Sequence, residues 1–232
     1  MASLVDSIKG VVQDSHPFFK IAGFSFVIFV VVQLTSYDNV SPFFKFLATA
    51  LTFFAFFGFM LESLSNLANE ENIVMPGLLN PLRLIMQGIK GTLSLLPCLA
   101  LVYYGMNWFI SVFTFVPWVN YILLTIVFVV LLSFFVVSLL LYVKKYNPIA
   151  SYNFKNIFKY SGDFIVYNFV LVVNVIILLG VVFFPIGIFV KLVFNYGLVF
   201  EYYLIFTIVF TIMVMLHYYA QLYFEYIDLS DT

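Results

Sequence analysis

The stretch "NYILLTIVFVVLLSFFVVSLLLYV", residues 120–143, decides the fold, because it runs for 24 positions without a charged residue. A helix needs about 20 predominantly apolar residues to cross about 30 Å of hydrocarbon. These residues therefore predict a transmembrane helix. Applied to the rest of the chain, the same criterion identifies five further spans. The six predicted spans are residues 18–35, 43–61, 92–113, 120–143, 164–190 and 199–224.

The composition of the whole chain agrees with this prediction. Hydrophobic residues make up 64% of the 232 positions and charged residues only 9%, and the mean hydropathy is +1.11. A soluble domain has about 25% charged residues, because water must wet its surface. Lipid must cover most of this surface instead. The predicted fold class is all-α: a polytopic membrane protein with about six transmembrane helices, arranged as hairpins 18–61, 92–143 and 164–224.

Short amphipathic stretches precede each hairpin. In "NPLRLIMQGIKG", residues 80–91, the apolar stripe at helical spacing consists of Leu82, Ile85, Met86 and Ile89. Arg83 and Lys90 lie off that stripe, and Leu84 is its one apolar exception. Segments of this kind are typical of helices that lie in the membrane interface. We predict two or three interfacial helices on the cytoplasmic side, at residues 3–14, 80–90 and 149–160.

The same pattern sets the expected domain organisation. Each amphipathic stretch is followed by a hairpin, so the chain divides into three similar units within one domain, residues 1–232. Two explanations stay open. The units are true repeats, or interfacial helices simply occur before spans without a common origin.

Basic residues predict the orientation, because Lys and Arg near the ends of spans are retained on the cytoplasmic side. Placing both termini on one side gathers eight of the ten basic residues there. They are Lys9, Lys20, Arg83, Lys90, Lys144, Lys145, Lys155 and Lys159. The other side keeps Lys45 and Lys191. Both termini are therefore expected to be cytoplasmic.

The order of several loose motifs resembles the prokaryotic membrane family known as domain of unknown function 4013. The motifs are Gly58-Phe59, a polar connection at residues 66–72, Met75-Pro76, the element Gly88 to Gly91, and the closing "HYYAQLYFEYI". The resemblance covers most of the chain, from about residue 17 to 227. It implies six spans and a place in the prokaryotic cytoplasmic (inner) membrane. It implies no catalytic residue and no cofactor.

Three groups of residues are candidates for function. His217, Gln221, Asn168 and Asn174 form a candidate polar cluster within the spans. Pro97, Pro185 and Gly187 are candidate hinge positions, because proline and glycine interrupt transmembrane helices in transporters. Ala48, Thr52, Ala55 and Gly58 form a stripe of small residues suited to close helix packing.

Several classes of chemistry lack their usual motif. The chain contains no G-x-S-x-G elbow and no H-E-x-x-H zinc motif. Cys98 is its single cysteine, which excludes an intrachain disulfide. The net charge of −1 gives no indication of a nucleic-acid partner. We therefore expect no enzyme, no metal and no cofactor.

These observations leave three hypotheses for the function, of which the first two are the main ones. The first is a non-catalytic subunit or scaffold that acts by association, with the lipid bilayer and either another membrane protein or further copies of itself as partners. The alternative is a carrier or permeation path for a lipidic or other hydrophobic substrate. A polar cavity lined by Asn168, Asn174 and His217 would favour the carrier, and dry packing would oppose it. The least favoured is an enzyme that uses His217.

Overall fold

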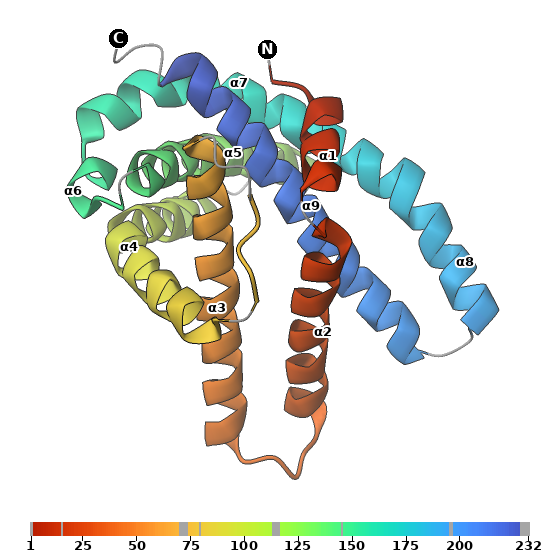
Figure 1. The fold of residues 1–232 in the computed structure, drawn as a ribbon. Helices are drawn as coiled ribbons and strands as arrows, with labels where there is room; N and C mark the ends of the chain where they lie inside the picture. Colours follow the sequence, from red (N-terminus) through yellow and green to blue (C-terminus); the bar gives the residue numbers. More distant parts are fainter. Residues whose placement is uncertain are drawn as a thin grey trace.

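The computed structural model describes residues 2–14, 16–69, 74–78, 80–112, 117–144, 146–194 and 197–227. All regular secondary structure in these residues is helical (Figure 1). The elements are α1 (Leu4–Gln13), α2 (Pro17–Ser36), α3 (Pro42–Ala68), α4 (Pro81–Val112), α5 (Pro117–Val143), α6 (Pro148–Ser151), α7 (Phe154–Ile177), the π-helix η1 (Leu178–Phe183), α8 (Phe184–Phe194) and α9 (Gly197–Tyr226).

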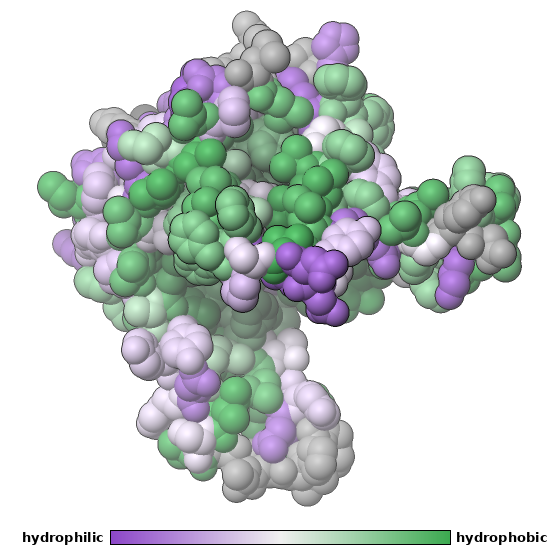
Figure 2. All heavy atoms as spheres, turned by 90° about the horizontal axis from the view of Figure 1, so that it is seen from below, coloured by the Kyte–Doolittle hydropathy of each residue, from purple (hydrophilic) through white to green (hydrophobic). Residues whose placement is uncertain are grey.

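Six helical segments are long and apolar enough to cross a membrane, which confirms a multi-pass helical protein. They are Pro17–Ser36, Pro42–Ala68, Pro81–Val112, Val119–Val143, Phe154–Phe194 and Gly197–Tyr226. Only 11% to 33% of the residues in the most apolar part of each are buried. Hydrophobic side chains cover much of the face seen from below, and hydrophilic ones lie in separate groups (Figure 2). A surface of this kind needs lipid around it.

In the second and third units, the helices of the structure begin and end at other residues than the predicted segments. The expected interfacial helix 80–90 is the first part of α4, which continues without a break to Val112. Residues 149–160 divide between the four-residue α6 and the start of α7, which runs on through η1 into α8. At 1.5 Å per residue, α4 is about 48 Å long, well beyond the thickness of the hydrocarbon.

A real break separates α1 from α2. His16 has a φ of 53° and a ψ of 50°, in the left-handed region that a non-glycine residue rarely adopts, and Pro17 follows as the first residue of α2. Ser3 caps the start of α1 by accepting a hydrogen bond from the Asp6 N–H. The segment predicted at residues 3–14 is thus a helix of its own, separated from the first span by a break at His16.

The closest contact between helices lies where α3 crosses α4. A Cβ atom on Gly58 would overlap the carbonyl oxygen of Leu84, and one on Gly88 would overlap the carbonyl oxygen of Phe54. Because glycine has no side chain, Gly58 and Gly88 let the backbones of the two helices touch. This contact determines which side of α4 packs against α3. Leu84, the exception to the apolar stripe, is 2% exposed, whereas Leu82 and Met86 of the stripe are 73% and 53% exposed.

The predicted small-residue stripe of α3 is divided between neighbours within the chain. Gly58 meets the backbone of α4. Ala55 packs against the buried core. Thr52 lines a hollow of about 280 Å³ between α2 and α3, and Ala48, one turn before it, is half-buried. Only the Gly58 end therefore makes the close backbone contact that the stripe predicts.

Helix α9 is the centre of the molecule. It packs against α1, α2, α3, α5, α7 and α8, and it runs diagonally across the bundle, crossing α1 and α2 near their junction (Figure 1). Its buried residues lie mostly in the second half, from Thr207 to Tyr223. The core of the protein therefore lies at the end of the bundle where α1 begins and α9 finishes.

Candidate functional site

The four residues predicted as one polar cluster do not come together in one place. Asn168 of α7 is buried between α5 and α9. Its Nδ2 donates to the Ser133 hydroxyl at 2.7 Å, and its Oδ1 accepts from the Tyr219 hydroxyl at 2.9 Å. Asn174 lies six residues further along α7 and is half-buried. The Asn168 amide thus joins three helices through hydrogen bonds.

His217 and Gln221 of α9 face α1 instead. The Gln221 side chain accepts from the Ser3 N–H at 2.8 Å and donates to the Ser7 hydroxyl at 3.1 Å. The His217 ring packs against Gly10, where an added Cβ would come within 2.6 Å of Nδ1. Its Nε2 is buried and has no hydrogen-bond partner among the described residues. Together these two residues fix α1 on the end of α9.

A buried carboxylate beside this contact was missed in the sequence. The Asp14 side chain accepts from the backbone N–H groups of Val74 and Met75 at 3.3 and 3.0 Å. The Lys20 ammonium pairs with it at 3.3 Å and also donates to the Met75 carbonyl at 2.6 Å. Asp14 therefore holds the segment after α3 against the junction between α1 and α2. The one available signal was an isolated acid next to a proline break.

A second ion pair clamps the crossing of α3 and α4. Arg83, the single arginine of the chain, pairs with the buried carboxylate of Glu62. The sequence placed Arg83 off the apolar stripe of a predicted interfacial helix and gave no sign of this pairing. The pair lies one turn beyond the contact of Gly58 with α4, so charge and close packing act on the same crossing.

The predicted hinge at Pro97 does not interrupt α4. Next to it, the buried Cys98 thiol donates to the Ser138 hydroxyl at 3.1 Å, and Ser138 donates to the Ser151 carbonyl at 2.8 Å. The Ser151 hydroxyl lies 3.2 Å from the Ser94 carbonyl. Helices α4, α5 and α6 are thus tied together beside the proline.

The predicted hinge at Pro185 coincides with a real irregularity. Proline has no N–H to donate, and its ring clashes with the carbonyl four residues earlier. The chain widens here into η1, and the Phe184 N–H bonds to the Leu179 carbonyl, five residues back. Such π-helical turns relieve a local conflict and often mark functional sites.

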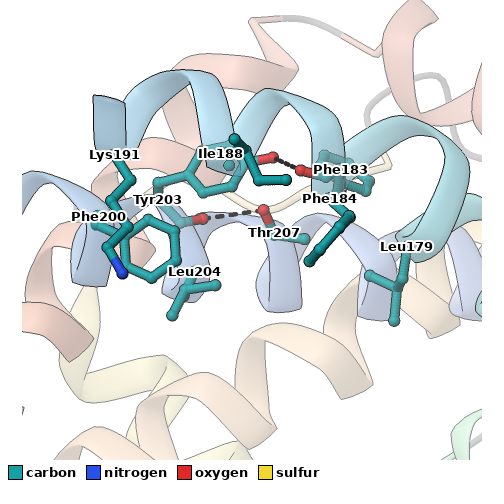
Figure 3. Close-up of a pocket in the computed structure, with 10 residues that line it drawn as sticks. Leu179, Phe183, Phe184, Ile188, Lys191, Phe200, Tyr203, Leu204 and Thr207 are labelled. Atoms are coloured by element: carbon teal, nitrogen blue, oxygen red, sulfur yellow. Dashed lines mark hydrogen bonds between the residues drawn. The ribbon is translucent and has the colours of Figure 1, made fainter. Parts of the chain in front are cut away.

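An apolar cleft of about 340 Å³ lies beside this turn, between η1–α8 and α9 (Figure 3). Its lining residues are Leu179, Phe183, Phe184, Gly187, Ile188, Lys191, Phe200, Tyr203, Leu204 and Thr207. The Tyr203 hydroxyl donates to the Phe183 carbonyl at 2.5 Å. At one end, the Lys191 ammonium lies 5.7 Å from the centre of the Phe200 ring. This cleft has the size and character of a site for a small hydrophobic ligand.

Among the described residues, no three side chains of His, Cys, Asp or Glu come together to hold a metal ion. Comparisons with models of protein families, with curated proteins and with solved structures gave no match. The family resemblance of the sequence therefore stays a prediction.

Proposed function

We propose that the protein is a non-catalytic subunit or scaffold that acts by association within the prokaryotic cytoplasmic membrane. The main support for this proposal is the hydrogen bonding of the Asn168 side chain. Its amide bonds to Ser133 and Tyr219 in a buried contact between three helices, and the cleft beside η1 is lined by other residues. A carrier would turn such groups toward a polar cavity.

The proposal includes an orientation with both termini in the cytoplasm. It is supported by the uneven distribution of Lys and Arg, eight to two. It is also supported by the contact of α1 with the last turns of α9, which brings the two ends of the described chain together. Six spans return the chain to the side on which it starts.

Helix α8 is the surface that we assign to association. It packs chiefly on η1 and α9 and stands clear of α2 to α5 (Figure 1). Phe189, Leu192 and Val193 are exposed large apolar residues on it. A helix from another membrane protein, or from a second copy, would bury them without displacing an internal contact.

The test is purification from native-level expression in a mild detergent, followed by mass spectrometry of the intact assembly. We expect a stoichiometric protein partner or a second copy. Phe189→Ala with Leu192→Ala should release it, whereas the matched change Phe43→Ala with Phe46→Ala on the exposed start of α3 should not. A monomer without protein partners would overturn the proposal.

The cleft of Figure 3 supports a second candidate, a carrier for a hydrophobic substrate that moves at the bend before Pro185. Gly187 is the sensitive position, because a Cβ there would lie 3.0 Å from the Tyr203 ring. Gly187→Leu should fill the cleft and abolish binding of a fluorescent fatty acid. Gly180→Leu is the control, since no atom within 4 Å opposes a Cβ at that position of η1. Equal binding by both variants would exclude the cleft.

A further inference from the structure

A different hollow, of about 490 Å³, lies where α4, α5 and α6 meet. It is lined by Gln87, Lys90, Leu93, Ser94, Tyr142, Tyr146 and Pro148. Like the cleft beside η1, it combines apolar surface with a cation and hydroxyl groups, but it also has an amide, that of Gln87. We propose that this hollow binds a phosphate group that carries a neighbouring hydrogen-bond donor.

Lys90 supplies the charge for the phosphate. Its side chain is exposed at the hollow, and no ion pair joins it to a carboxylate among the described residues. No acidic residue is among those that line the hollow. An ammonium group without a nearby carboxylate attracts an anion, and hydrogen bonds between ionised partners are about twice as strong as neutral ones.

Gln87 supplies the second contact. Its side-chain oxygen is buried at the edge of the hollow and has no hydrogen-bond partner among the described residues. A buried acceptor without a donor is unfavourable, and native proteins rarely leave one. A hydroxyl or ammonium group next to the bound phosphate would satisfy it.

Tyr146 gives independent support from the backbone. It lies three residues after the end of α5 and has a φ of 47°, and the Asn147 N–H bonds to the Tyr142 carbonyl at 3.2 Å. This is the Schellman ending of a helix, whose left-handed residue is usually glycine. A tyrosine there is strained, and such strain collects at functional sites. Its ring lines the hollow and packs edge-on against Tyr142, with ring centres 5.7 Å apart.

Two sources provide this ligand chemistry. One is the headgroup of an anionic phospholipid such as phosphatidylglycerol, whose acyl chain would follow the exposed Leu93 of α4. The other is a free phosphate compound. The shared chemistry is a phosphate held by Lys90 with a donor facing Gln87.

The experiment uses the full chain in a neutral, phosphate-free detergent. Phosphatidylglycerol, phosphatidylcholine and inorganic phosphate are titrated separately, and bound ligand is counted by native mass spectrometry. We expect one saturable phosphatidylglycerol site, weaker binding of phosphatidylcholine, which lacks the donor, and about tenfold weaker phosphatidylglycerol binding in Lys90→Gln. Lys155→Gln, an exposed lysine at the start of α7, is the matched control and should bind as the wild type does.

The separate titrations distinguish a lipid headgroup from a free phosphate compound as the source of the ligand. Inorganic phosphate that binds as tightly as the lipid, and is lost in Lys90→Gln, would support the site and assign it to a soluble ligand. Gln87→Leu should lower the preference for phosphatidylglycerol over phosphatidylcholine, and circular dichroism checks its fold. Unchanged binding of all three probes in both Lys90→Gln and Gln87→Leu would overturn the proposal.

Discussion

At the scale of single residues, the α3–α4 crossing depends on two glycines. Gly88→Ala should destabilise the protein by about 1–3 kcal/mol, because the new methyl group meets the rigid backbone at Phe54 and forces the helices apart. Thermal unfolding of the purified protein in detergent measures the loss. Gly162→Ala in α7 is the control: nothing lies within 4 Å of its added Cβ, so its midpoint should stay level or rise. An unchanged or raised midpoint in Gly88→Ala, or an equal loss in both variants, would contradict the role of the backbone contact at Gly88.

The ion pair at the same crossing makes a second prediction for single residues. Arg83→Gln leaves the buried Glu62 carboxylate without its cation, and should cost about 1.5–3 kcal/mol. Adding Glu62→Gln should recover much of this, because the uncompensated charge disappears. A double-mutant cycle of unfolding free energies measures the coupling. Additive losses would mean that Glu62 gains nothing from Arg83.

At the scale of elements, α1 is held on α9 by few polar contacts. Gln221→Leu removes both partners of Gln221, the Ser3 N–H and the Ser7 hydroxyl. Amide hydrogen exchange should become faster in residues 4–13 and stay unchanged in α4. Gln33→Leu is the matched control, since Gln33 joins α2 to Glu201 in an exposed contact. Unchanged exchange in α1 would mean that apolar packing alone fixes it.

At the scale of the whole molecule, the orientation predicts which surfaces an impermeant thiol reagent reaches from outside intact cells. A cysteine at Ser36, at the end of α2, should react. Cysteines at Asn69 and Asn153, both exposed and after an even number of spans, should not. The native Cys98 is buried against Ser138 and should not react with the reagent. The reverse pattern would place both termini outside.

The sequence is enough to locate the spans, but it does not show which helices each span contacts, and the reason is physical. Hydropathy belongs to each segment by itself, so all six spans were found. Contacts depend on which faces meet. Gly58 was recognised as a packing residue, but its counterpart Gly88 was assigned to an interfacial helix. Asp14 bonds to backbone groups 60 and 61 residues away, which no local pattern predicts.

The contact of Ser3 with Gln221 joins residues 218 positions apart, and this has a consequence for biosynthesis. A ribosome adds about 5–20 residues per second, so α1 leaves the tunnel about 10–45 s before its docking site on α9 exists. Throughout that interval its apolar side must rest on lipid or on an insertion factor. The first helix made is therefore among the last to reach its final position, and release of a nascent chain truncated before residue 221 would leave it unattached.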